Sequence, residues 1–106
     1  TYWTTEHPSV AVMPMAALID AAVAMDHSAQ SIPALFWFST SDVVVRPDIS
    51  AEIASSWGGS TTVVNPTMGP GDDVQAHVIA GDIMSPGQTD AAVAGMLDWV
   101  RGLEGQ

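Results

Sequence analysis

A chain of 106 residues is long enough for one domain of ordinary size, and its 47% of apolar residues can form a packed core. Twelve acidic residues against two arginines and no lysine give a net charge of −10, which repels phosphate backbones and argues against a nucleic-acid partner. The absence of cysteine excludes disulfides, thiolate metal sites and a cysteine nucleophile, and it fits a cytoplasmic protein.

An apolar stretch near the start of the chain, residues 10–19, is too short to span a membrane, which takes about 18 uncharged apolar residues in a row. Pro14 interrupts it, and no positively charged segment precedes it as in a secretion signal. We therefore expect no membrane span. The chain begins at Thr1 without a strand or cap signal, which leads us to expect a piece of a longer protein.

The first predicted element is a helix over residues 14–25, with Pro14 in its first turn. Its many alanines favour a helix, and its larger apolar residues recur at helical spacing. The residues that share one face are Leu18, Ile19, Ala22 and Val23. This spacing indicates an amphipathic helix.

The second element is a strand over about residues 34–38, within the apolar run Ile-Pro-Ala-Leu-Phe-Trp-Phe of residues 32–38. Pro33 suits the start of a strand. The run shows no alternation with polar residues, which is typical of a strand covered on both faces in a parallel sheet. It ends at a polar loop that leads to Asp42, and we expect Trp37 to lie in the core.

A second helix is predicted over residues 49–57. Asp48 precedes it as a suitable N-cap, because a side-chain oxygen there accepts a free amide of the first turn. Gly58 and Gly59 end the helix. Trp57, at the end of the helix, is expected to belong to the core.

A short β-branched strand is predicted over residues 61–64. A long loop rich in glycine and proline follows over residues 65–87. The last helix covers about residues 89–103, with Thr89 as its cap. Its apolar stripe consists of Val93, Met96, Leu97 and Val100.

The alternation of helices and strands predicts an α/β fold, with residues 34–38 and 61–64 as parallel strands and helices beside them. Two strands alone do not make a stable parallel sheet covered by helices on both faces. The apolar strand at 34–38 needs a neighbour on each edge, and the sequence offers one. We therefore expect an incomplete sheet that pairs with a missing N-terminal part or with a second copy of the chain.

Two side chains able to do acid–base chemistry follow the two strands. Asp42 lies in the loop after the first strand, and His77 lies in the loop after the second. The carboxyl ends of parallel strands meet at one edge of a sheet, where functional groups of open α/β sheets gather. A carboxylate that meets an imidazole there holds one tautomer of the ring and stabilises its protonated form. We expect a carboxylate oxygen of Asp42 within hydrogen-bond reach of a ring nitrogen of His77.

The order of these segments resembles the C-terminal part of the α/β-hydrolase family. In residues 32–47, an apolar strand that begins at proline, a polar turn, Asp42, valines and Pro47 resemble the family's strand-and-acid motif. The stretch Gln-Ala-His-Val-Ile around His77 lies where the family carries its histidine, and Asp-Trp-Val at 98–100 resembles its final helix. Among the subgroups, the sequence is most similar to lysophospholipase-like and serine-aminopeptidase-like hydrolases.

The resemblance implies that residues 32–106 are the C-terminal part of a hydrolase core and that residues 1–31 are the end of a cap or a helix leading into it. It implies a serine hydrolase acting on an ester or related acyl substrate, with Asp42 and His77 as two members of a Ser-His-Asp triad and with no cofactor or metal. The sequence departs from the family in lacking a Gly-x-Ser-x-Gly nucleophile motif. This chain alone is therefore expected to be inactive.

The missing nucleophile motif leaves an alternative from another class of function. The chain would then be a non-catalytic α/β module, related to hydrolases and used for binding or oligomerisation. A receiver-like signalling domain is disfavoured, because that class needs a lysine and the sequence has none.

Several other residues invite a functional interpretation. Val43 and Val78 directly follow the acid and the histidine, and by resemblance they would line the acyl pocket. Met68 and Met84 are interpreted as gap-filling residues beside them. Asp82 is a candidate to support the histidine loop through hydrogen bonds to its backbone.

The remaining acidic residues and histidines of note have simpler interpretations. Asp72 and Asp73 are interpreted as residues of a solvated turn, because their spacing to His77 matches no known metal-ligand pattern. His7 and His27 are interpreted as surface or helix-end residues.

Overall fold

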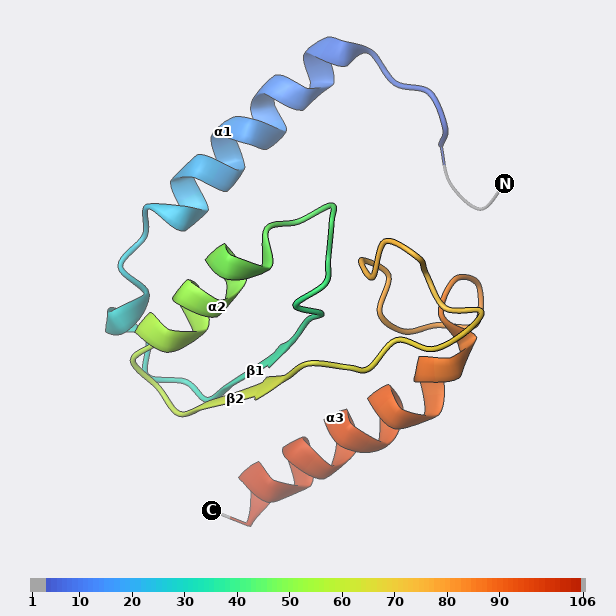
Figure 1. Ribbon diagram of the computed structural model, residues 1–106. Helices are drawn as coiled ribbons and strands as arrows, with labels where there is room; N and C mark the ends of the chain where they lie inside the picture. Colours follow the sequence, from blue (N-terminus) through green and yellow to red (C-terminus); the bar gives the residue numbers. More distant parts are fainter. Residues whose placement is uncertain (1–3, 106) are drawn as a thin grey trace.

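The computed structural model of the protein describes residues 4–105. Its regular elements, in chain order, are η1 (Ser9–Ala11), α1 (Val12–Val23), η2 (His27–Ala29), β1 (Ala34–Trp37), α2 (Pro47–Ser56), β2 (Thr61–Val64), η3 (Pro86–Gln88) and α3 (Thr89–Glu104). Figure 1 shows α2 and α3 on opposite sides of the two strands, with α1 beyond α2. Every predicted helix and strand is present, and the ends differ from the predicted ones by at most two residues.

The two strands form a parallel pair in which Ala34 lies opposite Thr61 and Trp37 lies opposite Val64. The ladder continues past the last pair, where the Phe38 amide donates to the Val64 carbonyl at 3.1 Å. The sheet of the described residues consists of these two strands. The small α/β architecture is thus as predicted, and β1 has a strand neighbour on one edge.

Two predicted helix caps are wrong. Pro47 is the first residue of α2, since its fixed φ suits a helix start, so Asp48 lies inside the first turn and pairs with Arg46 at 2.5 Å. Thr89 is itself the first residue of α3, and its hydroxyl donates to Asp82 Oδ1 at 2.7 Å instead of capping the helix.

An aromatic cluster joins the end of α2 to β1 and to the segment before it. The Trp57 indole N–H donates to the Ile32 carbonyl at 2.8 Å, and its ring lies edge-on to Phe36 at 5.8 Å between centroids. His27 stacks on the same indole at 6.2 Å. Gly59 permits this approach, because a Cβ there would lie 2.3 Å from the Ile32 carbonyl oxygen. Trp57 is half-buried, so it is less covered than the predicted core position implies.

Helix α3 contacts the sheet closely at one point. A Cβ added to Gly95 would lie 2.4 Å from Cη2 of Trp37, so the helix backbone lies directly against the indole ring. This contact half-buries Trp37, and glycine is the residue that allows it.

Large apolar side chains remain uncovered elsewhere. The buried apolar residues in the described part of the chain are three alanines, Ala54, Ala76 and Ala92. Leu18 on the predicted stripe of α1 is 70% exposed, and the stripe of α3 is also exposed. The radius of gyration is 15.8 Å, whereas a compact domain of this length has about 13 Å. No helix within residues 4–105 combines the length and apolar character needed to cross a bilayer.

Candidate functional site

Asp42 and His77 meet at the carboxyl edge of the sheet. Oδ2 of Asp42 lies 3.0 Å from Nδ1 of His77, although the two residues are 35 positions apart in the sequence. The contact that the sequence predicts is therefore present. The Asp42 side chain is 10% exposed and the His77 side chain 40%, so the ring reaches outward from a largely covered carboxylate.

The second carboxylate oxygen of Asp42 is held by the backbone of its own loop. Oδ1 accepts the Val44 amide at 2.8 Å and the Val45 amide at 2.9 Å. Burial by itself raises the pKa of Asp42, but the hydrogen bonds from His77, Val45 and Val44 together lower it below its usual value. Asp42 is therefore a carboxylate at neutral pH, and its orientation towards His77 is set from both oxygens.

Asn65 links the two strand ends that carry the pair. It follows β2 directly, its Oδ1 accepts the Thr40 amide at 3.0 Å, and its Nδ2 donates to Thr40 Oγ1 at 3.1 Å. A second tie joins the loops further out, where the Val43 amide donates to the Gln75 carbonyl at 3.1 Å. Asn65 is not among the predicted site residues, although its position directly after a parallel strand is a signal that could have suggested it.

The loop that carries His77 is organised by Asp73. The Asp73 carboxylate accepts the amides of Gln75, His77 and Val78 at 3.1, 3.2 and 2.9 Å. These bonds lower the pKa of Asp73, with the Val78 amide as the largest cause. The solvated-turn interpretation of this residue is wrong, because aspartate accepts amides that follow it in the chain and thereby builds its own buried turn.

The proposed support from Asp82 is not found. Asp82 is exposed and accepts the Thr89 hydroxyl, as described above. Asp73, nine residues earlier, makes the hydrogen bonds to the backbone of the histidine loop that were expected of Asp82. Sequence spacing alone did not distinguish the two, because both are aspartates in the same glycine-rich loop.

Asp72 organises the other half of the same loop. Its Oδ2 accepts the Gly69 amide at 2.8 Å and Gln88 Nε2 at 2.7 Å, and its Oδ1 accepts the Gly87 amide at 3.0 Å. The side-chain bond from Gln88 is the largest cause that lowers the pKa of Asp72. Asp72 thus fastens the long loop to the start of α3, and its interpretation as a solvated residue is also wrong.

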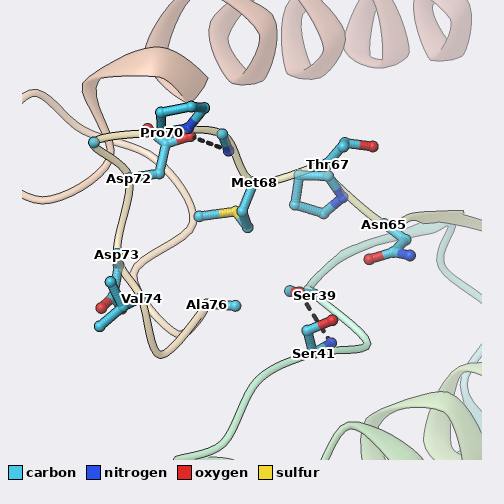
Figure 2. A pocket seen from close by; sticks show the side chains of 13 residues that line it. Ser39, Ser41, Asn65, Thr67, Met68, Pro70, Asp72, Asp73, Val74 and Ala76 are labelled. Atoms are coloured by element: carbon cyan, nitrogen blue, oxygen red, sulfur yellow. Dashed lines mark hydrogen bonds between the residues drawn. The ribbon is translucent and has the colours of Figure 1, made fainter.

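A hollow of about 520 Å³ lies beside the pair, between the loop after β1 and the loop after β2 (Figure 2). Ser41 and Ala76 line it, and they directly precede Asp42 and His77 in the sequence. Figure 2 shows Ser39 and Ser41 on one wall, with Met68 between them and the Asp72 loop. The hollow is a mixed polar and apolar space lined by the sequence neighbours of the pair, while Asp42 and His77 themselves are not among its lining residues.

The structure does not bring the two predicted pocket valines together at this hollow. Val43 is exposed and absent from its walls, whereas Val78 is half-buried and lines a separate hollow of about 240 Å³. Met68 lines the first hollow and Met84 the second.

The other histidines lie away from the pair. His7 is exposed, as interpreted from the sequence. His27 begins η2, but its ring is partly covered by Trp57 and its Nε2 is buried without a hydrogen bond, so it is a packing residue more than a surface one. Residues 4–105 contain no cluster of three or more His, Asp or Glu side chains placed to hold a metal ion.

Comparison of the chain with protein-family models, with curated proteins and with solved structures found no match.

Proposed function

We propose that Asp42 and His77 are the acid and the base of a Ser-His-Asp triad, in the C-terminal part of a serine hydrolase that acts on an ester or related acyl substrate. The observation that carries this proposal is the 3.0 Å contact between Asp42 Oδ2 and His77 Nδ1 at the carboxyl edge of a parallel strand pair. The proposal requires a nucleophilic serine from sequence beyond these residues, since the chain has no nucleophile motif.

The geometry suits general base catalysis. When Nδ1–H donates to Asp42, the neutral ring carries its lone pair on Nε2, at the exposed side of His77. Nε2 takes the proton of the serine hydroxyl as its oxygen attacks the acyl carbon, and then returns the proton to the leaving alcohol. The same nitrogen next takes a proton from the water that attacks the acyl-enzyme, and gives it to the serine oxygen as the bond to the acyl group breaks and the acid leaves. Asp42 stays ionised throughout and stabilises the imidazolium.

The hollow beside the pair supports a small-molecule substrate. Its walls combine hydroxyl and amide side chains with Met68, as a site needs that fixes a polar head while contacting an apolar part. Within residues 4–105 the apolar strand β1 has a strand neighbour on one edge alone, and we propose that further strands of the same hydrolase core, or a second copy of the chain, pair at the other edge.

A second candidate function is a non-catalytic α/β binding or oligomerisation module. The lack of a nucleophile motif favours this candidate. Within the described residues the His77 ring forms a hydrogen bond through Nδ1, and no serine is bonded to Nε2. The two candidates differ in one measurable property, because a triad reacts with a serine-directed phosphonate and a binding module does not.

The experiment is fluorophosphonate labelling of the protein encoded by the complete reading frame that contains this sequence. We expect one labelled serine, and its labelling should slow by a factor on the order of 10⁴ in Asp42→Asn and on the order of 10⁶ in His77→Gln. His7→Gln is the matched control, because His7 is exposed and far from the pair in sequence, and it should label at the parent rate. No labelled serine, or equal rates in His77→Gln and the parent, would rule out the triad.

A further inference from the structure

A buried polar arrangement lies beneath the His77 backbone and is not explained by the pair itself. Ser85 has 0% exposure and Asp73 has 9%, although both side chains are polar. The Ser85 hydroxyl accepts the Asp73 amide at 3.0 Å and donates to the Val78 carbonyl. Burying a carboxylate is costly unless hydrogen bonds replace its water, and here three backbone amides do so.

We infer that Asp73, braced by Ser85, is the positioning residue that holds the His77 ring against Asp42. This inference rests on the proposed function, since positioning has a catalytic meaning only if His77 is the base. Asp73 does not touch the reacting atoms. It acts through the backbone, because a single oxygen, Oδ2, accepts the amides of both His77 and Val78 and so sets the direction in which the His77 side chain leaves the chain.

The conformation of Ala76 shows why such a brace is needed. Ala76 directly precedes His77 and has a φ of 51°, in the left-handed region that residues with a Cβ rarely adopt. A residue stays in that region only when its surroundings hold it there. The Ala76 amide donates to the Asp73 carbonyl at 2.9 Å, so Asp73 restrains the turn with its backbone as well as its side chain. Without the carboxylate, Ala76 relaxes and His77 turns away from Asp42.

The neighbouring residue supplies a matched control. Asp72 is buried to a similar degree and also accepts three hydrogen bonds, but its donors are Gly69, Gly87 and Gln88 and none belongs to the His77 turn. Replacing Asp72 removes the same number of bonds from the same loop without releasing His77. A difference between the two variants therefore separates positioning from general stabilisation of the loop.

The test measures the tautomer of His77 by ¹⁵N NMR in the protein encoded by the complete reading frame that contains this sequence, at a pH where the ring is neutral. A free histidine in water favours the Nε2–H tautomer, whereas the bond to Asp42 selects Nδ1–H. We expect Nδ1–H in the parent chain and in Asp72→Ala, and loss of that preference in Asp73→Ala and Ser85→Ala. Asp73→Asn keeps the side-chain volume and one acceptor oxygen, so it should retain part of the Nδ1–H population.

The Trp57 indole N–H signal, from its bond to Ile32, reports separately that each variant is folded. If Asp73→Ala loses that signal, Asp73→Asn and Ser85→Ala provide the measurement. Folded Asp73 and Ser85 variants with an unchanged Nδ1–H tautomer overturn the positioning role and leave the proposed function intact. A parent chain without the Nδ1–H preference overturns both, because the pair itself is then absent.

Discussion

The polar loops at the carboxyl edge of the sheet and the helices around it differ sharply in how they are held. The loops, residues 38–46 and 65–88, contain buried polar side chains whose oxygens accept backbone amides, with Asp72, Asp73 and Ser85 as examples. Helices α1 and α3 instead expose the apolar stripes that would ordinarily be covered. In this chain the candidate site is organised locally by hydrogen bonds, while the apolar faces of the helices around it remain exposed to water.

Site geometry and core formation are therefore separable in this chain. A turn built by aspartate carboxylates needs no second layer, since each carboxylate binds amides a few residues away. An apolar stripe stabilises the folded state only when another surface covers it and removes it from water.

Acid should destabilise the polar loops more than any of the substitutions below changes the helices. Asp42, Asp72 and Asp73 all have pKa values below the usual one, so the folded loops bind fewer protons than the unfolded chain. Their stabilisation is fully present above the ordinary aspartate pKa, about 4, and is lost as pH falls through the lower folded values. Amide hydrogen exchange should show loop protection unchanged from pH 7 to about 5 and lost below about 4. Loop protection that persists far below those values would contradict this account.

A smaller effect is expected where α3 meets the sheet. Gly95→Ala places a methyl group against the Trp37 ring and should lower the free energy of unfolding by about 1–3 kcal/mol, despite the better helix propensity of alanine. Gly102→Ala lies in the same helix with open space around its Cβ and should raise it by up to about 1 kcal/mol. Urea unfolding of both variants measures the difference, and equal shifts would show that α3 does not pack on Trp37 in solution.

The smallest effect is expected on the exposed stripe of α1. Leu18→Ala should change the free energy of unfolding by no more than about 0.5 kcal/mol, because the side chain is already in water. Urea unfolding at several protein concentrations provides the measurement. A cost above about 2 kcal/mol, with a midpoint that rises with concentration, would show that a second copy of the chain covers this face.

The regular elements and their order follow from local patterns in the sequence. Helical spacing in residues 14–25, the apolar run at 34–38 and the β-branched residues 61–64 depend on local pattern and burial, and each lies within two residues of its predicted place. Parallel strands end at the same edge, so the meeting of Asp42 and His77 was also predictable from the sequence. Their chemical role stays a prediction that the labelling experiment addresses.

The residues that hold the site in place follow instead from the three-dimensional path of the loops. Asp73 rather than Asp82 supports the histidine turn, and Asn65 joins the strand ends. These roles depend on the path of an irregular loop, including the left-handed conformation of Ala76, for which alanine carries no sequence signal. The hydrogen-bond partners of an aspartate are set by where the backbone turns, and in a long loop that path follows from many contacts together instead of from a repeating local pattern.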